Sequence, residues 1–311
     1  MPPNNWGVKA VTREQTMTVF KGLDEIVQCD CPLGKATTIG VGGNAEYFAR
    51  PRTEEELREV LVRAEKAGIV VRALGRGSNL LVRDEGVPGV VVQLDAAGFG
   101  QITVEDDLLR AGAAAPLAKV VAEAARKGLA GVECLVGIPG SVGGAIRMNA
   151  GGAHGDIGQT VERVRAMDAH GQVFLRDRDD LLFGYRTSNV TARFILEADL
   201  RLMPDASRNI AARMKRIWIA KKNSQPMNAA SAGCVFKNPR GLSAGMMIDQ
   251  CGLKGTGVGA AIVSRKHANY IVVKDKAGAK AADVLALIEL VRNAVKERFS
   301  VSLELEIEIW P

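Results

Sequence analysis

The sequence predicts an α+β fold of two lobes, and three observations lead to this prediction. Helical stripes of apolar residues alternate with short strand-like runs between residues 53 and 136. The composition changes near residues 203–205, which marks a boundary between the lobes. Two glycine-rich segments, residues 75–79 and 137–145, stand beside apolar, strand-like residues. One such segment would fit a tight turn, but two in one lobe favour backbone N–H groups that converge on an anionic ligand.

The first element with a clear signature is a helix that begins after Thr53. Thr53 followed by Glu56 is a capping box, and Gly68 ends the pattern. The apolar residues at helical spacing are Leu57, Val60, Leu61 and Ala64. Strands are predicted next at residues 69–71, 80–82 and 90–92, the first of them leading into the first glycine segment.

A second helix is predicted between Pro116 and Gly128, with an apolar stripe of its own. Leu135 and Val136 then lead, as strand-like residues, into the second glycine segment. Beyond the boundary, residues 208–222 read as a basic helix with a solvated face. An amphipathic helix follows at about residues 281–299.

The C-terminal residues 301–309 alternate strictly between apolar and polar and predict one strand. Its three glutamates, Glu304, Glu306 and Glu308, would share one face, and a wet sheet face is the default interpretation. Residues 1–22 carry no clear period and read as a loosely held extension. The predicted units are therefore the extension 1–22, a first domain 23–204 and a second domain 205–311.

Composition excludes several classes of protein. The chain of 311 residues has no apolar run of membrane-spanning length and no signal-peptide layout at its start, which predicts a cytoplasmic protein. Five scattered cysteines and three histidines predict neither a disulfide framework nor a metal site. The net charge of +6 is modest and spread out, so small anionic molecules fit better than nucleic acid.

Seven short motifs, in one order, resemble those of the UDP-N-acetylenolpyruvoylglucosamine reductase family in its shorter, type II form. The motifs are residues 41–45, 74–81, 137–145, 148–151, 184–188, 231–239 and 263–270. The resemblance implies a vanillyl-alcohol-oxidase (PCMH)-type FAD-binding domain over 23–204. A smaller α/β substrate-binding domain, which ends in a catalytic strand, would occupy 205–311.

By this resemblance the chain would bind FAD and use NADPH in a ping-pong reduction. NADPH gives a hydride to FAD and leaves, and the hydride then passes to the enolpyruvyl double bond of UDP-N-acetylglucosamine enolpyruvate. The product is UDP-N-acetylmuramate, a peptidoglycan precursor. The residues implied to hold FAD are Gly75, Arg76, Gly77, Ser78, Asn79, Gly137, Pro139, Gly140, Ser141, Gly144 and Asn149.

Three residues fall on catalytic positions of the family. Arg186 matches the arginine that stabilises the enolate, and a permanent cation suits a carboxylate. Glu306 matches the catalytic glutamate, and to act as a proton donor it would have to be covered and raised in pKa. Cys234 stands where many members carry the proton-donating serine; a thiol is mostly protonated at neutral pH and can serve as the acid.

Four further residues, Lys237, Asn238, Lys254 and His267, lie at or beside positions that contact the UDP-sugar in the family. A structural role for His267 stays open, because a lone histidine is often only a hydrogen-bonding residue. The chain is expected to be a monomer without nucleic-acid or membrane partners.

The chain departs from the family pattern at a few places, and two other functions stay open. Residues 38–43 lack the usual aromatic and arginine, Leu305 replaces a common proline, and Arg147 places a cation near the second glycine segment. The first alternative is a flavin-dependent sugar or lactone oxidase that uses O₂. The second is a flavin-binding homologue without catalytic activity.

Overall fold

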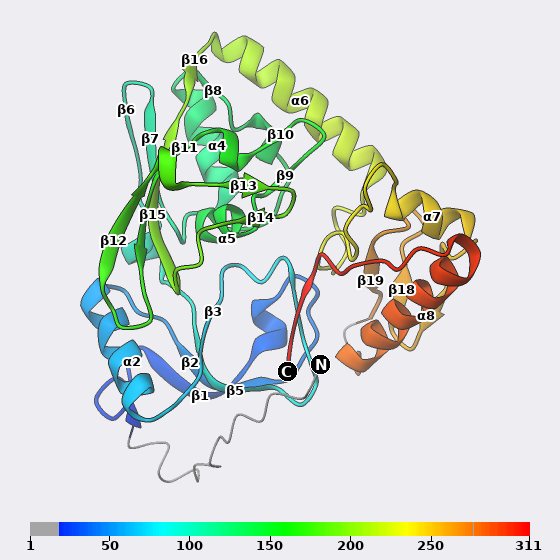
Figure 1. Ribbon diagram of the computed structural model, residues 1–311, viewed down its shortest axis with the longest axis horizontal. Coiled ribbons are helices and arrows are strands. Elements are labelled where there is room, and N and C mark those ends of the chain that lie inside the picture. Colours follow the sequence, from blue (N-terminus) through cyan, green and yellow to red (C-terminus); the bar gives the residue numbers. More distant parts are fainter. Residues whose placement is uncertain (1–18, 276) are drawn as a thin grey trace.

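The computed structural model describes residues 19–275 and 277–311, which form three groups of elements (Figure 1). Of the predicted N-terminal extension, residues 1–18 lie outside the described part. Phe20 is buried, and its ring packs edge-on against Tyr47 with the ring centroids 5.1 Å apart. Phe20, the second described residue, therefore belongs to the core.

The first group is a four-stranded sheet covered by one helix. Its order is β1 (Val27–Pro32), β2 (Asn44–Ala49), β5 (Val87–Val92) and β3 (Val71–Ala73). Helix α2 (Glu54–Lys66) begins where the capping box predicts, because the Thr53 hydroxyl accepts a hydrogen bond from the Glu56 N–H at 3.2 Å. The four residues of its predicted stripe are all buried against this sheet.

The second group is a five-stranded antiparallel sheet with two helices over it. Its order is β12 (Val173–Asp177), β11 (Val161–Met167), β15 (Phe194–Arg201), β7 (Leu108–Gly112) and β6 (Ile102–Glu105). Helices α4 (Leu117–Arg126) and α5 (Val142–Arg147) share its core. Short elements complete this lobe: α3 (Ala96–Phe99), β8 (Leu129–Ala130), β9 (Gly151–Gly152), β10 (Gly155–Asp156), β13 (Phe183–Gly184), β14 (Thr187–Ser188), β16 (Met203–Pro204) and 3₁₀ turns at Leu33–Ala36, Ile157–Gln159 and Arg178–Asp180.

The strand-like interpretation of the residues before the second glycine segment is wrong. Glu133–Leu135 forms a 3₁₀ helix, and the N–H of Val136 donates to the Glu133 carbonyl at 3.0 Å. The Glu133 side chain also accepts from the Gly131 N–H at 2.6 Å. These local bonds hold the segment in a turn, although Leu135 is as apolar and as buried as a strand residue.

Helix α6 (Ser207–Ser224) packs on the second group, against α4 and the turn Glu133–Leu135. The third group contains α7 (Ala244–Gln250), α8 (Ala281–Phe299) and the sheet β17 (Gly257–Val258), β18 (Ala261–Val263) and β19 (Ile271–Val273). The basic helix and the amphipathic helix are both where the sequence predicts them. Asp84, from the first group, accepts hydrogen bonds from the first two N–H groups of α8, Ala281 at 2.8 Å and Ala282 at 2.9 Å. Over the described ranges, no helix combines the length and the apolar character needed to cross a membrane.

The predicted nine-residue C-terminal strand is wrong, because only β20 (Glu308–Trp310) is a strand. Before it, the chain pairs irregularly with the third group: the Lys237 N–H donates to the Glu304 carbonyl and the Glu306 N–H donates to the Val235 carbonyl. From Glu308 onward it pairs in parallel with β4 (Leu80–Val82) of the first lobe. The alternating run changes partners at residues 306–308, which interrupts the ladder, and Figure 1 shows this C-terminal segment reaching back toward the N-terminal sheet.

Candidate active site

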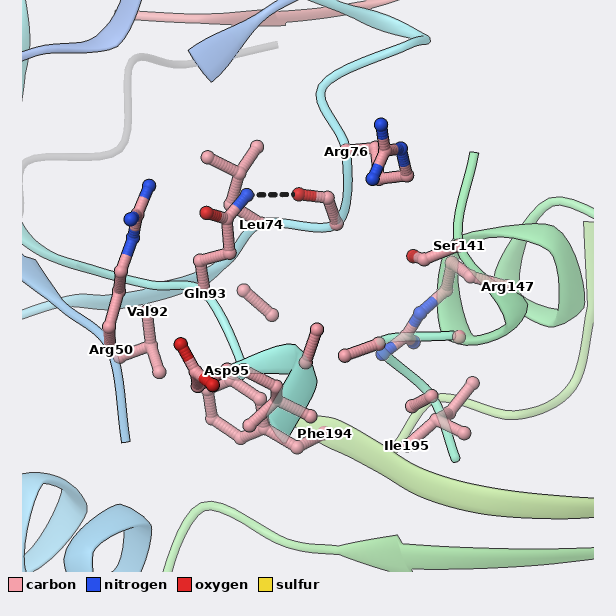
Figure 2. Close-up of a pocket in the computed structure, with 18 of the residues that line it drawn as sticks. Arg50, Leu74, Arg76, Val92, Gln93, Asp95, Ser141, Arg147, Phe194 and Ile195 are labelled. Carbon is pink, nitrogen blue, oxygen red and sulfur yellow. Dashed lines mark hydrogen bonds between the residues drawn. The ribbon is translucent and has the colours of Figure 1, made fainter. Parts of the chain in front are cut away.

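The two glycine segments lie side by side at one cavity of about 310 Å³. A Cβ atom on Gly75 would lie 2.9 Å from the Ser141 hydroxyl oxygen, so the first segment approaches the second too closely for a side chain. In Figure 2, Ser141 and Arg147 lie across this cavity from Arg50. Within the described ranges, the backbone N–H groups of Gly75 and Arg76 find no hydrogen-bond acceptor. These donors are therefore open to a ligand.

Positive charge surrounds this cavity. Arg50, Arg76, Arg147 and Arg193 line it, and none of them pairs with a carboxylate of the described residues. Arg147 is fixed by hydrogen bonds from its guanidinium to the carbonyls of Val190 and Ala192. Burial lowers the pKa of Arg147 below its usual value, as expected of a cation that lacks an anionic partner.

Four of the residues predicted to hold the cofactor line this cavity: Gly75, Arg76, Ser141 and Gly144. The others lie beside it or shape the loops. Gly77 has a left-handed backbone (φ +61°), where a Cβ would meet the Ala36 carbonyl, and Gly137 packs against Trp218 of α6. Pro139 and Ser78 flank these turns, and the Gly140 carbonyl accepts from the N–H of Leu117.

The two predicted cofactor asparagines bind backbone groups near the catalytic candidates. The Asn79 side chain donates to the Glu306 carbonyl at 3.0 Å. The buried Asn149 side chain donates to the Gly184 carbonyl at 2.9 Å and accepts from the Gly158 N–H at 3.0 Å. Both side chains therefore connect the glycine segments to distant parts of the chain.

Arg186 is presented by the tip of a tight hairpin. Strands β13 and β14 pair Gly184 with Thr187, which leaves Tyr185 and Arg186 as the turn, and Arg186 has a left-handed backbone (φ +56°). Such a conformation is strained for a residue with a Cβ, and it turns the side chain inward. The Arg186 guanidinium also donates to the Gly151 carbonyl at 3.1 Å, which fixes its direction.

Arg186 forms an ion pair with Glu306 over 2.5 Å, and both side chains are mostly buried. Burial raises the pKa of Glu306 above its ordinary value, although Arg186 acts in the opposite direction. Burial alone would lower the pKa of Arg186, but the attraction and hydrogen bond of Glu306 raise it. Of the three alternating glutamates, Glu306 is thus the one that is both covered and paired.

Cys234 lies beside this pair. A β-bridge opposes Cys234 to Tyr270, and Asn269 holds the next residues, because its carbonyl accepts from Val235 and its side chain bonds both backbone groups of Phe236. Burial, and then the charge of Glu306, raise the pKa of the Cys234 thiol to about 12, while Arg186 and a hydrogen bond with Tyr270 act against this. The thiol is therefore fully protonated at neutral pH.

The four predicted substrate residues divide into two places. The Lys237 ammonium lies 3.6 Å from the Glu304 carboxylate. Its positive charge partly opposes the rise in the pKa of Glu306 that burial causes. The Asn238 N–H donates to the Tyr185 hydroxyl at 3.1 Å, which joins the third group to the Arg186 hairpin. Lys254 pairs with Asp249 at 2.6 Å. Burial, and then Lys254, lower the pKa of His267, whose ring packs edge-on against Tyr270.

Several residues of this region carried no signal of their own in the sequence. Arg193 and Gln93 line the cavity, and Asn269 shapes the Cys234 segment. Lys221 of α6 donates to the carbonyls of Cys134 and Val136, just before the second glycine segment. Of these, only Asn269 falls within a motif, and a motif does not show which neighbour a side chain will contact.

Both halves of the chain match known domain families. Residues 225–310 match the model of the C-terminal domain of UDP-N-acetylenolpyruvoylglucosamine reductase, and residues 45–175 match an FAD-binding domain. The reductase of Clostridium botulinum is 40% identical over 285 residues, which are 91% of this chain and 92% of the relative. The chain belongs to the UDP-N-acetylenolpyruvoylglucosamine reductase family.

Two further members of the family are similar over nearly the whole chain. The reductase of Syntrophobacter fumaroxidans is 42% identical over 284 residues, which are 89% of this chain and 82% of the relative. The crystal structure of the reductase from Thermus caldophilus is 40% identical and superposes with a TM-score of 0.79. It covers 90% of this chain and 97% of the relative. The PCMH-type FAD-binding fold followed by a reductase C-terminal domain is thereby confirmed.

The cavity fits the FAD that this family binds. A dinucleotide has a pyrophosphate with two negative charges, and the cavity offers open N–H groups, the Ser141 hydroxyl and unpaired guanidinium groups. A side chain on Gly75 would fill the space between the two segments. Gly75, Arg76, Ser141 and Gly144 are thus the residues that would hold the pyrophosphate.

Proposed function

We propose that this chain reduces UDP-N-acetylglucosamine enolpyruvate to UDP-N-acetylmuramate with NADPH, through bound FAD. The observation that carries the proposal is the buried Arg186–Glu306 pair with the protonated thiol of Cys234 beside it. FAD, when bound, would supply the hydride carrier between NADPH and the substrate. The chain's own residues then have to stabilise one developing charge and supply one proton.

Arg186 is proposed to stabilise the negative charge that develops on the substrate. A hydride that adds to the terminal carbon of the enolpyruvyl group leaves negative charge on the neighbouring carbon and its carboxylate. A guanidinium is planar, permanently charged and suited to a carboxylate. The hairpin and the Gly151 carbonyl hold the Arg186 guanidinium in place before substrate arrives, so no reorganisation is needed during the reaction.

Cys234 is proposed to give its proton to that neighbouring carbon, which completes the reduction. A donor has to be protonated at the working pH, and the raised pKa of the buried thiol meets this condition. Glu306 is proposed to orient Arg186 and to act as a hydrogen-bonding group whose raised pKa eases its protonation. Lys237, Asn238, Lys254 and His267 are proposed to bind the UDP-sugar.

The proposal extends to the whole protein. We propose that residues 23–204 form the FAD-binding domain and residues 205–311 the substrate-binding domain. A monomer is supported by the fact that Arg186, Cys234 and Glu306 all come from one chain. A cytoplasmic location is supported by the substrates, since NADPH and UDP-sugars are cytoplasmic metabolites. Light scattering of the purified protein would test the monomer.

The decisive experiment adds the two substrates in turn to the purified protein without oxygen. Loss of the flavin absorbance on adding NADPH, and its return on adding UDP-N-acetylglucosamine enolpyruvate, is the expected result. A return caused only by oxygen would instead support a sugar or lactone oxidase. Bound flavin that responds to neither substrate would support a homologue without activity.

A further inference from the structure

The C-terminal segment that carries Glu306 is held at the point where it changes partners. The N–H groups of Glu306 and Ile307 both donate to the Val235 carbonyl of the third group, at 2.8 and 3.4 Å, and from Glu308 the chain pairs with β4. Neither ladder spans residues 306–308, so the position of the Glu306 backbone depends on bonds from outside a regular sheet.

Asn79 provides these bonds from the end of the first glycine segment. Its side-chain nitrogen donates to the Glu306 carbonyl at 3.0 Å, and its own carbonyl accepts from the Glu308 N–H at 2.9 Å. One residue therefore holds the chain on both sides of the point at which it crosses between the lobes. The next residue, Leu80, begins the pairing of β4 with Glu308.

The same glycine segment lines the cavity that fits FAD. Gly75 and Arg76 lie at that cavity, and the Gly77 carbonyl accepts a hydrogen bond from the Thr38 N–H at 3.1 Å, which holds the segment between the cavity and Asn79. At the other end, Glu306 pairs with Arg186 over 2.5 Å. A displacement of the Glu306 backbone would lengthen this ion pair, because the hairpin and the Gly151 carbonyl hold Arg186 independently.

We propose that Asn79 is a positioning residue, which sets the Glu306 backbone relative to the cofactor cavity and so keeps Glu306 in contact with Arg186. The inference rests on the proposed reductase function for its kinetic consequence, but not for its structural one. Small displacements of a catalytic group reduce rates steeply.

Two substitutions at Asn79 distinguish the effect of losing the hydrogen-bond donor from the effect of losing side-chain volume. Asn79→Ala removes the amide, and Asn79→Leu keeps a similar size without a donor. In both, the substrate-dependent return of the flavin absorbance is expected to slow about tenfold or more relative to its loss with NADPH, which is measured on the same flavin-loaded sample. Thermal denaturation checks that both variants are folded.

A second readout does not depend on activity. Besides burial, three neighbouring groups shift the pKa of Cys234. The charge of Glu306 raises it, and Arg186 and the hydrogen bond with Tyr270 lower it. If the Glu306 carboxylate moves away, the pKa of Cys234 falls, because the negative charge that raised it is gone and Arg186 loses its partner. The rate of Cys234 alkylation by iodoacetamide, followed by mass spectrometry across pH, is therefore expected to rise at a lower pH in both variants.

Gln93→Ala is the matched control. The Gln93 amide donates to the Gly75 carbonyl at 2.6 Å, so this variant loosens the same segment without touching Glu306. It is expected to weaken FAD binding and to leave the pH dependence of Cys234 alkylation unchanged.

The outcomes decide the inference whether or not the reductase function holds. A lower alkylation pKa in both Asn79 variants, but not in Gln93→Ala, supports the positioning role. An unchanged pKa, or faster alkylation by one factor at every pH, would mean only loosened packing and would overturn it. Wild-type protein whose flavin absorbance never returns with substrate would count against the reductase function alone.

Discussion

The chemistry of Cys234 depends on its surroundings more than on its type. Burial and the Glu306 charge raise its pKa to about 12, so a thiol that would ordinarily begin to ionise above neutral pH stays protonated. A proton donor is active below its pKa and inactive above it. The substrate-dependent step is therefore expected to show no loss of rate from Cys234 ionisation between about pH 8 and 10. Stopped-flow traces across this range check it, and a fall in rate that Cys234→Ser removes would contradict it.

Substitutions of Cys234 are expected to separate the two half-reactions. Cys234→Ser keeps a hydroxyl donor and should retain appreciable turnover. Cys234→Ala should keep the NADPH-dependent loss of flavin absorbance but lose its substrate-dependent return, because the proposed proton donor is removed. Single-turnover measurements of both steps check this, and equal slowing of both in the alanine variant would remove Cys234 from the mechanism.

Arg186→Lys tests whether geometry, rather than charge alone, is needed. A lysine keeps the cation but cannot hold the carboxylate of Glu306 and the Gly151 carbonyl in one plane. The substrate-dependent step is expected to slow by about 10²–10³-fold, as for loss of one preorganised donor. The NADPH-dependent step serves as the internal control, and a lysine variant with wild-type rates in both steps would contradict the assigned role.

At this scale the sequence identified the residue types but could not choose among neighbours. The alternating pattern makes Glu304, Glu306 and Glu308 equally good candidates for the catalytic glutamate, and only the family resemblance selects Glu306. In the structure the Glu304 side chain is 79% exposed and that of Glu306 is 11% exposed. The difference arises because Arg186 and the Cys234 segment, both distant in sequence, cover one glutamate. The hydrogen-bond partners of Asn79 and Asn149 could not be predicted either, because they too come from other segments of the chain.

At the scale of elements, helix α8 depends on a cap from the other lobe. Asp84→Ala removes the acceptor of the Ala281 and Ala282 N–H groups and is expected to lower the free energy of unfolding by about 1–2 kcal/mol. Urea denaturation measures this change. Glu85→Ala is the control, because it removes the same charge from the neighbouring residue, whose side chain makes no hydrogen bond within the described ranges. Equal effects of the two variants would show that the cap contributes nothing.

Local signals predicted the elements that they fully determine. The capping box at Thr53 placed α2, and the amphipathic pattern placed α8 from residue 281 to residue 299, as observed. The alternating C-terminal run failed as a single strand because its backbone partners, Val235 and β4, lie in different lobes. The prediction of strand-like residues at Leu135 and Val136 was wrong because local hydrogen bonds, including the one that the Glu133 side chain accepts, hold this segment in a turn. Periodicity describes a segment, whereas pairing requires knowledge of its neighbour.

At the scale of the whole molecule, Trp310 joins the end of the chain to the first lobe. It is 7% exposed in a cluster with Leu33, Phe48 and Leu80. Trp310→Ala is expected to lower the free energy of unfolding by about 3–5 kcal/mol. Trp218→Ala, at a side chain that is 43% exposed, is expected to have a clearly smaller effect. Thermal denaturation of both variants decides this, and similar melting temperatures would contradict it.

The sequence predicted two lobes, but it did not indicate which residues join them. The predicted boundary near residues 203–205 falls between β15 and α6, but α6 packs back on α4 and the turn Glu133–Leu135. However, Ile39, Val41 and Leu81 of the first lobe share a core with α8 and the third group. The sequence shows that a residue is apolar, but it does not show which lobe its side chain will pack against.

The contact between Asn79 and Glu306 also affects the order in which the protein folds. These residues are 227 positions apart, and contacts of such separation form late because closing a long loop loses entropy before the contact is made. The two sheets of the first lobe can form from nearer segments. During refolding, the capacity to bind flavin is therefore expected to return before the capacity to reduce substrate, and an intermediate would hold its coenzyme while still lacking the residues that finish the reaction.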